Sequence, residues 1–154
     1  MKKLVLGSLS AVLLASSMTA TAMDAEDAIQ FRQAGYKFMA WNMAKIKAMA
    51  IDGDVEWNAQ QVQAAANSIA ATANSGMGAL YIPGTAKNVG DTKTRVKPEM
   101  FTDMDGVTQV GMAFHKAAND LAAAAETGDK ATVAKAFAAA GESCKGCHDK
   151  FRMD

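Results

Sequence analysis

The 154-residue sequence contains few of the side chains that cross-link a chain or gather metal ions. It has only two cysteines, Cys144 and Cys147, and only two histidines, His115 and His148. A disulfide between residues three positions apart would close a very small loop and remove little entropy from the unfolded chain. The scarcity of cysteine therefore excludes a disulfide-stapled scaffold, and the cysteine pair needs a chemical explanation rather than a structural one.

The chain also lacks an excess of charge and a long apolar run. Lysine plus arginine and aspartate plus glutamate number 16 each, and no basic run occurs. The composition therefore gives no support to nucleic-acid binding. The one long apolar stretch, residues 4–15, is about 12 residues and too short to cross a bilayer, so no membrane anchor is predicted.

The first 22 residues have the order of a secretory signal peptide. Lys2 and Lys3 precede the apolar stretch, and the small residues 20–22 end it. This order predicts cleavage after Ala22 and export to the periplasm. The mature chain, residues 23–154, then keeps 14 basic and 16 acidic residues, for a formal charge of −2. We expect it to be one soluble domain.

Proline is nearly absent, occurring only at positions 83 and 98, whereas alanine and methionine, which favour helices, are abundant. Apolar residues recur every three or four positions, as amphipathic helices require. Helices are predicted over residues 24–50, 58–74, 103–126 and 129–152, with Asn58 and Asp129 as N-caps. Short turns join the first pair and the last pair, and an irregular crossover spans residues 79–100. The predicted fold is all-α, an antiparallel four-helix bundle with one long crossover.

Each predicted helix has an apolar face that we expect to point into the bundle. The expected inner residues are Phe31, Ala34, Phe38, Trp41, Met43, Ile46 and Met49 in the first helix, Val62, Ala65, Ile69 and Ala73 in the second, Val107, Val110, Phe114, Ala117 and Leu121 in the third, and Val133, Phe137, Ala140, Cys144, Cys147 and Phe151 in the fourth. Both cysteines therefore belong to the inner face of the last helix.

The cysteines lie in the sequence Cys-Lys-Gly-Cys-His at residues 144–148, and Cys-x-x-Cys-His is the attachment signature of a c-type haem. At about 100° per residue, the two thiols and the imidazole leave one face of a helix. The thiols can then form thioether bonds to the vinyl groups while His148 binds the iron. A thioredoxin-like pair would need a preceding strand, and a zinc site would need a fourth ligand, for which His115 is the only other histidine. One covalent haem c near the end of the fourth helix is the prediction.

The mature chain resembles the cytochrome c′ family of haem-bearing four-helix bundles over essentially its whole length. The resemblance is carried by Phe31 to Tyr36, Pro83 to Thr85, Lys97 to Glu99, Cys144 to His148 and the pair Phe151-Arg152. It implies that Arg32 and Gln33 lie at the haem, with Arg32 pairing a propionate, and that Tyr36 stands over the iron on its distal side. It also implies a homodimer. Further expected neighbours of the haem are Leu80, Tyr81 and Arg95.

The place of the motif in the chain bears on the sixth iron ligand. Only six residues follow His148, so a further ligand would come from upstream. Low-spin relatives place a methionine close to the position held here by Gly35 and Tyr36. Met39 and His115 are the remaining candidates, but methionine also fills cores and a histidine suits a helix boundary. We therefore expect His148 to be the only protein ligand of a five-coordinate, high-spin iron.

Such an iron has two possible functions, electron transfer and the binding of nitric oxide and carbon monoxide at an open distal face. One alternative is a low-spin electron carrier with methionine and histidine ligands. A haem peroxidase is a weaker alternative, because it needs polar acid–base groups on the distal side. We expect a haem protein that is not an enzyme, and the sequence does not identify its redox partner.

Overall fold

The computed structural model describes residues 23–154, so the predicted signal peptide and its cleavage site lie outside the described part. Its four long helices are α1 (Ala25–Lys47), α2 (Ala59–Ala73), α3 (Met104–Glu126) and α4 (Lys130–Phe151). The short segments are a π-helix, η1 (Ala48–Asp52), and two 3₁₀ helices, η2 (Met77–Leu80) and η3 (Pro98–Phe101). Residues 23–154 contain isolated β-bridges but no strand, which confirms the all-α prediction. None of the helices in this range is long and apolar enough to cross a membrane.

Each long helix starts at a short polar side chain that caps it. The carboxylate or amide oxygen accepts a hydrogen bond from a backbone N–H of the first turn: Asp24 from Glu26 at 2.7 Å, Asn58 from Gln61 at 3.0 Å, Asp103 from Gly106 at 2.9 Å and Asp129 from Thr132 at 2.7 Å. The cap satisfies a donor that has no acceptor within the helix and thereby fixes the first residue. The predicted caps Asn58 and Asp129 are confirmed.

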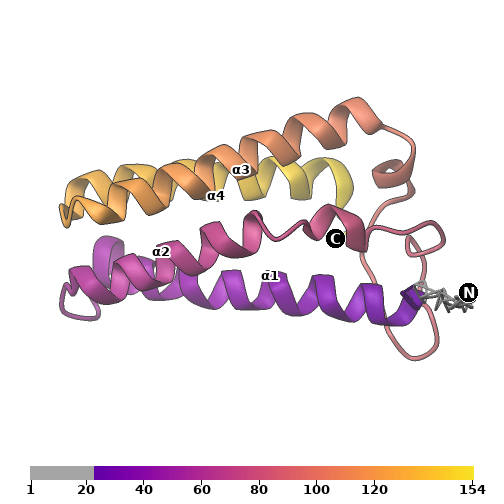
Figure 1. Ribbon diagram of the computed structural model, residues 1–154, viewed down its shortest axis with the longest axis horizontal. Coiled ribbons are helices and arrows are strands. Elements are labelled where there is room, and N and C mark those ends of the chain that lie inside the picture. The colour runs from indigo at the N-terminus through magenta and orange to yellow at the C-terminus, as the bar shows by residue number, and fades with distance from the viewer. Residues whose placement is uncertain (1–22) are drawn as a thin grey trace, which may run out of the picture.

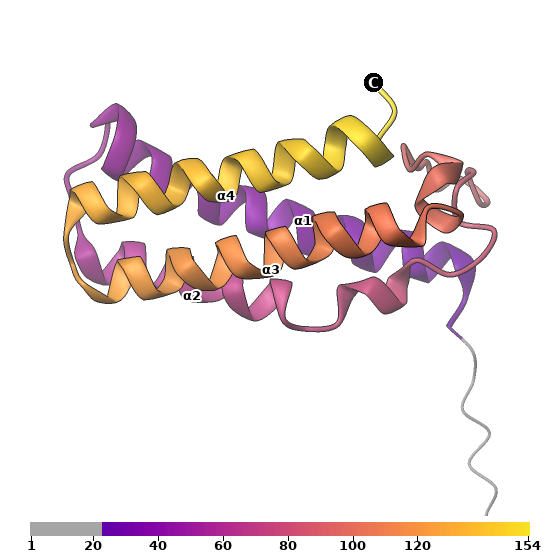
Figure 2. The same ribbon diagram turned by 90° about the horizontal axis from the view of Figure 1, so that it is seen from above.

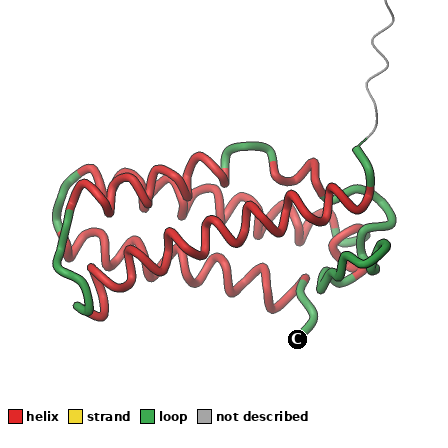
Figure 3. The backbone as a smooth tube through the Cα atoms, turned by 90° about the horizontal axis from the view of Figure 1, so that it is seen from below, coloured by secondary structure: helices red, strands yellow, loops and turns green. Residues whose placement is uncertain are grey.

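The helices form an antiparallel bundle with the two short turns at one end and the crossover at the other (Figure 1). The turn between α3 and α4 closes at Gly128, whose φ of 68° is in the left-handed region that favours glycine. Figure 2 shows α4 running beside α3, with the C-terminus of the chain at the crossover end. In Figure 3 most of the loop segments gather at the two ends of the bundle. This is the predicted topology of two helical hairpins joined by one long connection.

The packed core occupies the half of the bundle that holds the short turns. Its largest members are 1% exposed or less: Ile46, Val62, Ile69, Leu121 and Val133. These residues come from the end of α1, the first two-thirds of α2, the end of α3 and the start of α4. The contiguous core cluster includes no residue from the crossover and none of α4 beyond Ala140. The crossover half of the bundle is therefore built differently, and it contains the predicted haem motif.

The predicted inner face of the first helix is wrong for its aromatic residues. Phe31 and Trp41 are each 57% exposed and Phe38 is 48% exposed. The buried side of α1 instead contains Ala28, Ile29, Arg32, Met39, Asn42 and Ile46. Polar side chains can face inward when their donors are satisfied, as the Asn42 amide is by the Phe38 carbonyl at 3.0 Å. The aromatic stripe was the more apolar of the two faces, but it is not the face that the other helices cover.

The crossover is fastened to the end of α4 by backbone hydrogen bonds. The Lys97 N–H donates to the Phe151 carbonyl at 2.9 Å, and the Met153 N–H donates to the Arg95 carbonyl at 2.7 Å. Phe151, the last residue of α4, is buried. Pairing of residues 95–97 with residues 151–153 therefore closes the crossover end of the bundle and fixes where α4 stops.

We expect Leu121→Ala to lower the free energy of unfolding by about 3 kcal/mol, because it removes a fully buried side chain from the packed core and leaves a cavity. Met112→Ala is the matched control on the same helix, since Met112 is 69% exposed, and it should change the free energy by less than about 0.5 kcal/mol. Urea denaturation followed by circular dichroism measures both. Equal effects of the two substitutions would contradict the assignment of the core.

Candidate haem site

The last two turns of α4 contain the predicted attachment motif. Cys144 and Cys147 are half-buried and not disulfide-bonded, and His148 is exposed. Burial raises the pKa of both thiols, and at Cys147 the charge of Cys144 adds to this effect. Redox-active and zinc-binding cysteines need the opposite, a lowered pKa. Residues 23–154 also contain no group of three or more His, Cys, Asp or Glu side chains that could hold a metal ion. The pair is therefore unlike a dithiol redox centre or a zinc site.

The inner faces of α1 and α4 are partly accessible in the crossover half of the bundle. On α1, Tyr36 lies on the buried stripe between Arg32 and Met39, yet it is 40% exposed. On α4, both cysteines are half-buried although Ala140 and Phe151, on either side of them, are buried. We call these accessible inward-facing positions, Tyr36, Cys144 and Cys147, the cradle. The residues of this cradle fit a flat, largely apolar group such as a haem.

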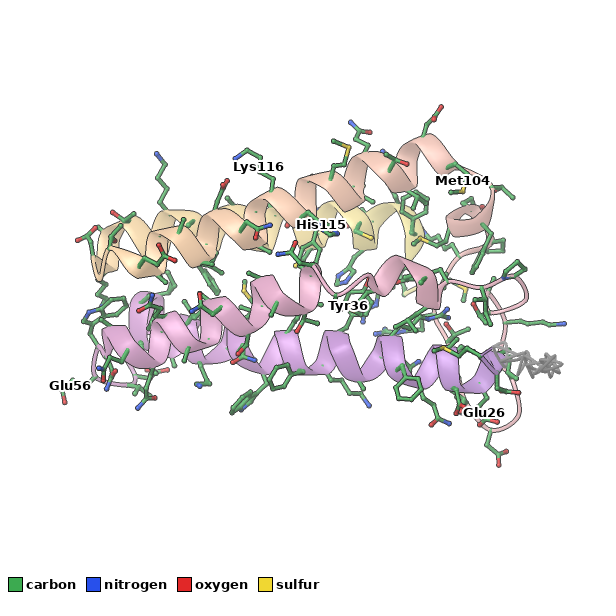
Figure 4. The ribbon with its side chains drawn as sticks, in the orientation of Figure 1. Glu26, Tyr36, Glu56, Met104, His115 and Lys116 are labelled. Carbon is green, nitrogen blue, oxygen red and sulfur yellow. The ribbon has the colours of Figure 1, made fainter. Side chains whose placement is uncertain are left out.

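Tyr36 forms a pair with Tyr81, which directly follows η2 in the crossover. The Tyr81 hydroxyl donates a hydrogen bond to the Tyr36 hydroxyl at 3.0 Å. Burial raises the pKa of both phenols, and a thiolate at Cys147 would raise both further by its negative charge. Because the effect of a charge on a pKa weakens with distance, both tyrosines lie near Cys147. Figure 4 shows Tyr36 directed from α1 toward the middle of the bundle. The structure thus brings the predicted distal residue, one predicted crossover neighbour and the attachment motif together.

Arg32 is 2% exposed and extends from α1 into the crossover. Nη1 donates to the Leu80 carbonyl at 3.3 Å and to the Thr85 hydroxyl at 2.8 Å. Nη2 donates to the Thr85 carbonyl at 2.7 Å and to the Thr94 hydroxyl at 2.9 Å. The guanidinium carbon also lies 4.8 Å from the centre of the Tyr81 ring, in cation–π contact. Every Nη hydrogen therefore has an acceptor, and all the acceptors are uncharged.

The charge of this buried guanidinium is not balanced by a carboxylate. None of the three ion pairs found among residues 23–154 involves Arg32. Burial lowers its pKa, and the neighbouring tyrosines act in the opposite direction. Arginine stays protonated even so. A buried cation without a carboxylate of the same chain is an environment that suits a haem propionate.

The other two predicted contact residues lie in different places. The Gln33 side chain is half-buried and donates through Nε2 to the Lys93 carbonyl at 2.6 Å, which ties α1 to the crossover beside Arg32. Arg95 is exposed and lines a surface hollow of about 430 Å³. His148 and Arg152 line the same hollow. Arg95 is therefore on the His148 side of the site, whereas Gln33 is on the Arg32 side.

His148 has a cationic neighbour one helical turn further on. Arg152 Nη1 lies 3.3 Å from Nδ1 of His148. A guanidinium can only donate, so Nδ1 accepts in this contact. In this tautomer the imidazole hydrogen is on Nε2, and binding of a metal at Nε2 would move that hydrogen to Nδ1, which could then no longer accept from Arg152. A histidine ligand usually donates its second N–H to an acceptor. The neighbour of Nδ1 here is a guanidinium, which is itself a donor.

The two alternative iron ligands, Met39 and His115, each have structural contacts of their own. Met39 is 5% exposed and belongs to the packed core cluster. His115 lies on α3, where its Nδ1 is 3.2 Å from the Asn74 side-chain oxygen and its ring stacks edge-on against Phe114 (Figure 4). Both positions suit the structural roles that methionine and histidine commonly have.

The residues that sequence reasoning missed are Thr85 and Thr94. Both are buried, and both accept hydrogen bonds from Arg32. Thr85 was visible in the Pro83-Gly84-Thr85 segment that carries the family resemblance, but Thr94 has no distinguishing local pattern. A polar residue in a predicted loop is ordinarily exposed. Only the hydrogen bonds from Arg32 of α1 identify Thr85 and Thr94 as buried residues of the site.

Comparison with known proteins gives one consistent result. The family model described as Cytochrome C' matches residues 27–152. Cytochrome c′ of Allochromatium vinosum is 57% identical over 144 residues, which cover 94% of this chain and 92% of the relative.

Solved structures agree with this match. A cytochrome c′ described as having an unusual ligand-controlled dimer dissociation has a TM-score of 0.83 at 56% identity, covering 86% of this chain and 99% of its own. Cytochrome c′ from Alcaligenes xylosoxidans, in a ferrous variant with bound nitric oxide, has a TM-score of 0.74 at 28% identity and covers 86% of this chain and 98% of its own. Another variant of that protein, similar to this chain as well, has carbon monoxide bound.

We expect the double variant Cys144→Ala/Cys147→Ala to release all of its haem into acid-acetone, because a group bound only through His148 has no covalent bond to the chain. The unaltered protein should keep its haem in the precipitate. The absorbance of the organic phase measures the released fraction, and Cys144→Ala alone is the control, since one thioether is enough for retention. Haem retained by the double variant would contradict attachment through these thiols.

Proposed function

The chain belongs to the cytochrome c′ family, and from this membership we propose that it is an exported, periplasmic haem protein that binds small neutral gases and exchanges electrons. The family carries a covalently attached c-type haem. The residues supporting export are Lys2, Lys3 and the apolar stretch 4–15, in the order typical of a signal peptide. A haem iron supplies reversible redox chemistry and an open coordination position.

In this proposal Cys144 and Cys147 form the two thioether bonds and His148 binds the iron through Nε2. The three side chains come from consecutive turns at the end of one helix, and the backbone pairing of residues 95–97 with residues 151–153 fixes that end. With iron on Nε2 the imidazole hydrogen would be on Nδ1, so Arg152 would lie beside the ring as a positive charge and not as a hydrogen-bond donor to it.

We assign the polar contacts of the haem to Arg32, Gln33 and Arg95. Arg32 supplies a buried positive charge with no carboxylate partner among residues 23–154. Its four Nη hydrogens are engaged by the crossover, so the remaining Nε–H is the donor that a propionate would meet first. Gln33 lies beside it, and Arg95 offers a solvent-exposed guanidinium next to His148.

The observation that carries the proposed function is the identity of the residue on α1 nearest the attachment motif. That residue is Tyr36, whose phenol is not a methionine or histidine ligand and whose oxygen is engaged by Tyr81. Met39 is held in the packed core and His115 is held against Asn74. His148 then remains the only protein ligand, and the iron is five-coordinate and high-spin.

An iron of this kind binds small ligands on its open side. The distal face presents the aromatic rings of Tyr36 and Tyr81, and the nitric oxide and carbon monoxide bound by variants of the Alcaligenes xylosoxidans protein support a diatomic ligand there. The exposed His148 beside Arg95 and Arg152 gives a place at the surface through which electrons can enter. A peroxidase is less well supported, because the Nη groups of Arg32 are all engaged and α1 has no histidine.

We also propose that the protein is a homodimer that pairs through α1. Phe31, Phe38 and Trp41 are spaced seven and three residues apart, which places them on one face, away from the buried stripe. The Phe38 and Trp41 rings are 5.9 Å apart, and Lys45 lies 4.7 Å from the centre of the Trp41 ring. An exposed face with several large aromatic residues is typical of a protein interface. Because Tyr36 is on the same helix, ligand binding can influence this contact, as the dimer dissociation of the similar protein suggests.

The ferric protein should give a high-spin EPR signal at neutral pH without added ligand, because only His148 binds the iron axially. The ferrous optical spectrum should change on addition of carbon monoxide or nitric oxide. Met39→Leu is the control and should alter neither result, since Met39 belongs to the core. A low-spin signal that Met39→Leu abolishes would establish the alternative, an iron with methionine and histidine ligands.

Trp41→Lys should weaken the dimer by about 30-fold or more, because it places a charge at the centre of an aromatic contact. Sedimentation velocity over a range of concentrations measures the association. Met112→Lys is the matched control, since Met112 is an exposed apolar residue on α3, and it should leave the association unchanged. An effect confined to Met112→Lys would place the interface on α3 instead.

A further inference from the structure

Three side chains form a continuous series from the crossover to the distal side of the site. The Arg32 guanidinium lies 4.8 Å from the centre of the Tyr81 ring, and the Tyr81 hydroxyl is 3.0 Å from the Tyr36 hydroxyl. Arg32 is itself held by four hydrogen bonds to Leu80, Thr85 and Thr94. The position of the Tyr81 ring is thus defined from one side by a fixed cation.

The other side of the Tyr81 ring is also occupied. The Phe101 ring, in η3, has its centre 6.4 Å away at an angle of 57°. Aromatic rings at this distance and inclination attract each other. Tyr81 therefore has contacts that restrict both the place of its ring and the direction of its hydroxyl, although it lies in an irregular segment between two 3₁₀ helices.

The direction of the hydrogen bond between the tyrosines has a consequence for Tyr36. A phenol has one hydrogen to donate and can accept at its oxygen. The two hydroxyl oxygens are 3.0 Å apart, so one hydrogen of the pair is shared between them and the other hydrogen is left over. A cation over the Tyr81 ring withdraws electron density from it and makes its hydroxyl the better donor of the two. The Tyr36 hydrogen is then available to a third group.

We propose that Arg32 and Tyr81 are positioning residues that hold Tyr36 as a hydrogen-bond donor to a ligand on the iron. This inference rests on the proposed function, in which the open coordination position lies between Tyr36 and the attachment motif. The ligands favoured are small ones whose outer atom is a good acceptor, such as cyanide. Carbon monoxide is a weak acceptor, so a hydrogen bond from Tyr36 adds less to its affinity. The crossover thereby sets which diatomic ligands the site prefers.

The test compares cyanide binding to the ferric protein with carbon monoxide binding to the ferrous protein. Tyr36→Phe should lower cyanide affinity relative to carbon monoxide affinity by roughly 10- to 100-fold, the range for a hydrogen bond to a charged group. Tyr81→Phe keeps the ring, its cation–π contact and its packing but removes the hydroxyl. It should lower the same ratio by about threefold or more, because Tyr36 is no longer held. The double variant should match Tyr36→Phe within about twofold, since Tyr81 acts only through Tyr36.

Infrared spectra of the carbon monoxide complex provide a readout that does not depend on affinity. A hydrogen bond to the ligand oxygen lowers the C–O stretching frequency, so this frequency should rise in Tyr36→Phe and rise or broaden in Tyr81→Phe. Met112→Leu is the control, because Met112 is exposed on α3 and belongs to neither the crossover nor α1, and it should leave the frequency unchanged.

The outcomes separate the proposals. Tyr81→Phe spectra and ligand ratios equal to those of the unaltered protein would overturn the positioning role, as would a shift of the same size in Met112→Leu. An unaltered frequency in Tyr36→Phe would overturn the donor role of Tyr36. If the unaltered protein bound neither cyanide nor carbon monoxide, the open coordination position itself would be wrong, and the proposed function would fail first.

Discussion

A guanidinium that is removed from water requires an acceptor for nearly every N–H, and Arg32 meets this requirement with oxygens that all come from the crossover. A shift of residues 80–94 that kept Arg32 covered but broke these hydrogen bonds would leave a buried charge without partners, which costs several kcal/mol. The crossover therefore has one favourable position against α1, although it has almost no regular secondary structure of its own. The positions of Tyr81 and of the distal wall depend on this single constraint.

A second attachment fixes the opposite side of the site. Backbone hydrogen bonds join residues 95–97 to residues 151–153, immediately after the attachment motif. The crossover thus bridges α1, which supplies Tyr36, and α4, which supplies the cysteines and His148. A cofactor bonded to one helix and facing another needs these two helices at a constant separation, and the crossover is the segment that is fastened to both.

The two halves of the bundle contribute differently to stability and to function. The half with the short turns holds the contiguous apolar core, with Leu121 and Ile69 near its centre, whereas the half with the crossover holds the accessible cradle. The helix α1 takes part in both halves and also presents the aromatic face of Phe31, Phe38 and Trp41 to solvent. A rigid helix shared by the site and by the proposed dimer interface offers a direct physical route for coupling between them.

Local rules were enough to determine the helices, their caps at Asn58 and Asp129, and the attachment motif. Capping and helical periodicity depend on residues a few positions apart, so a sequence contains them completely. Local rules did not determine the rotation of α1 about its axis, and its aromatic face was wrongly predicted to point inward. A buried arginine cannot be told from a surface arginine until its acceptors are known, and the Thr85 and Thr94 acceptors lie 53 and 62 residues away in the chain. Tertiary structure alone decided which face of α1 is interior, because only tertiary contacts satisfy those donors.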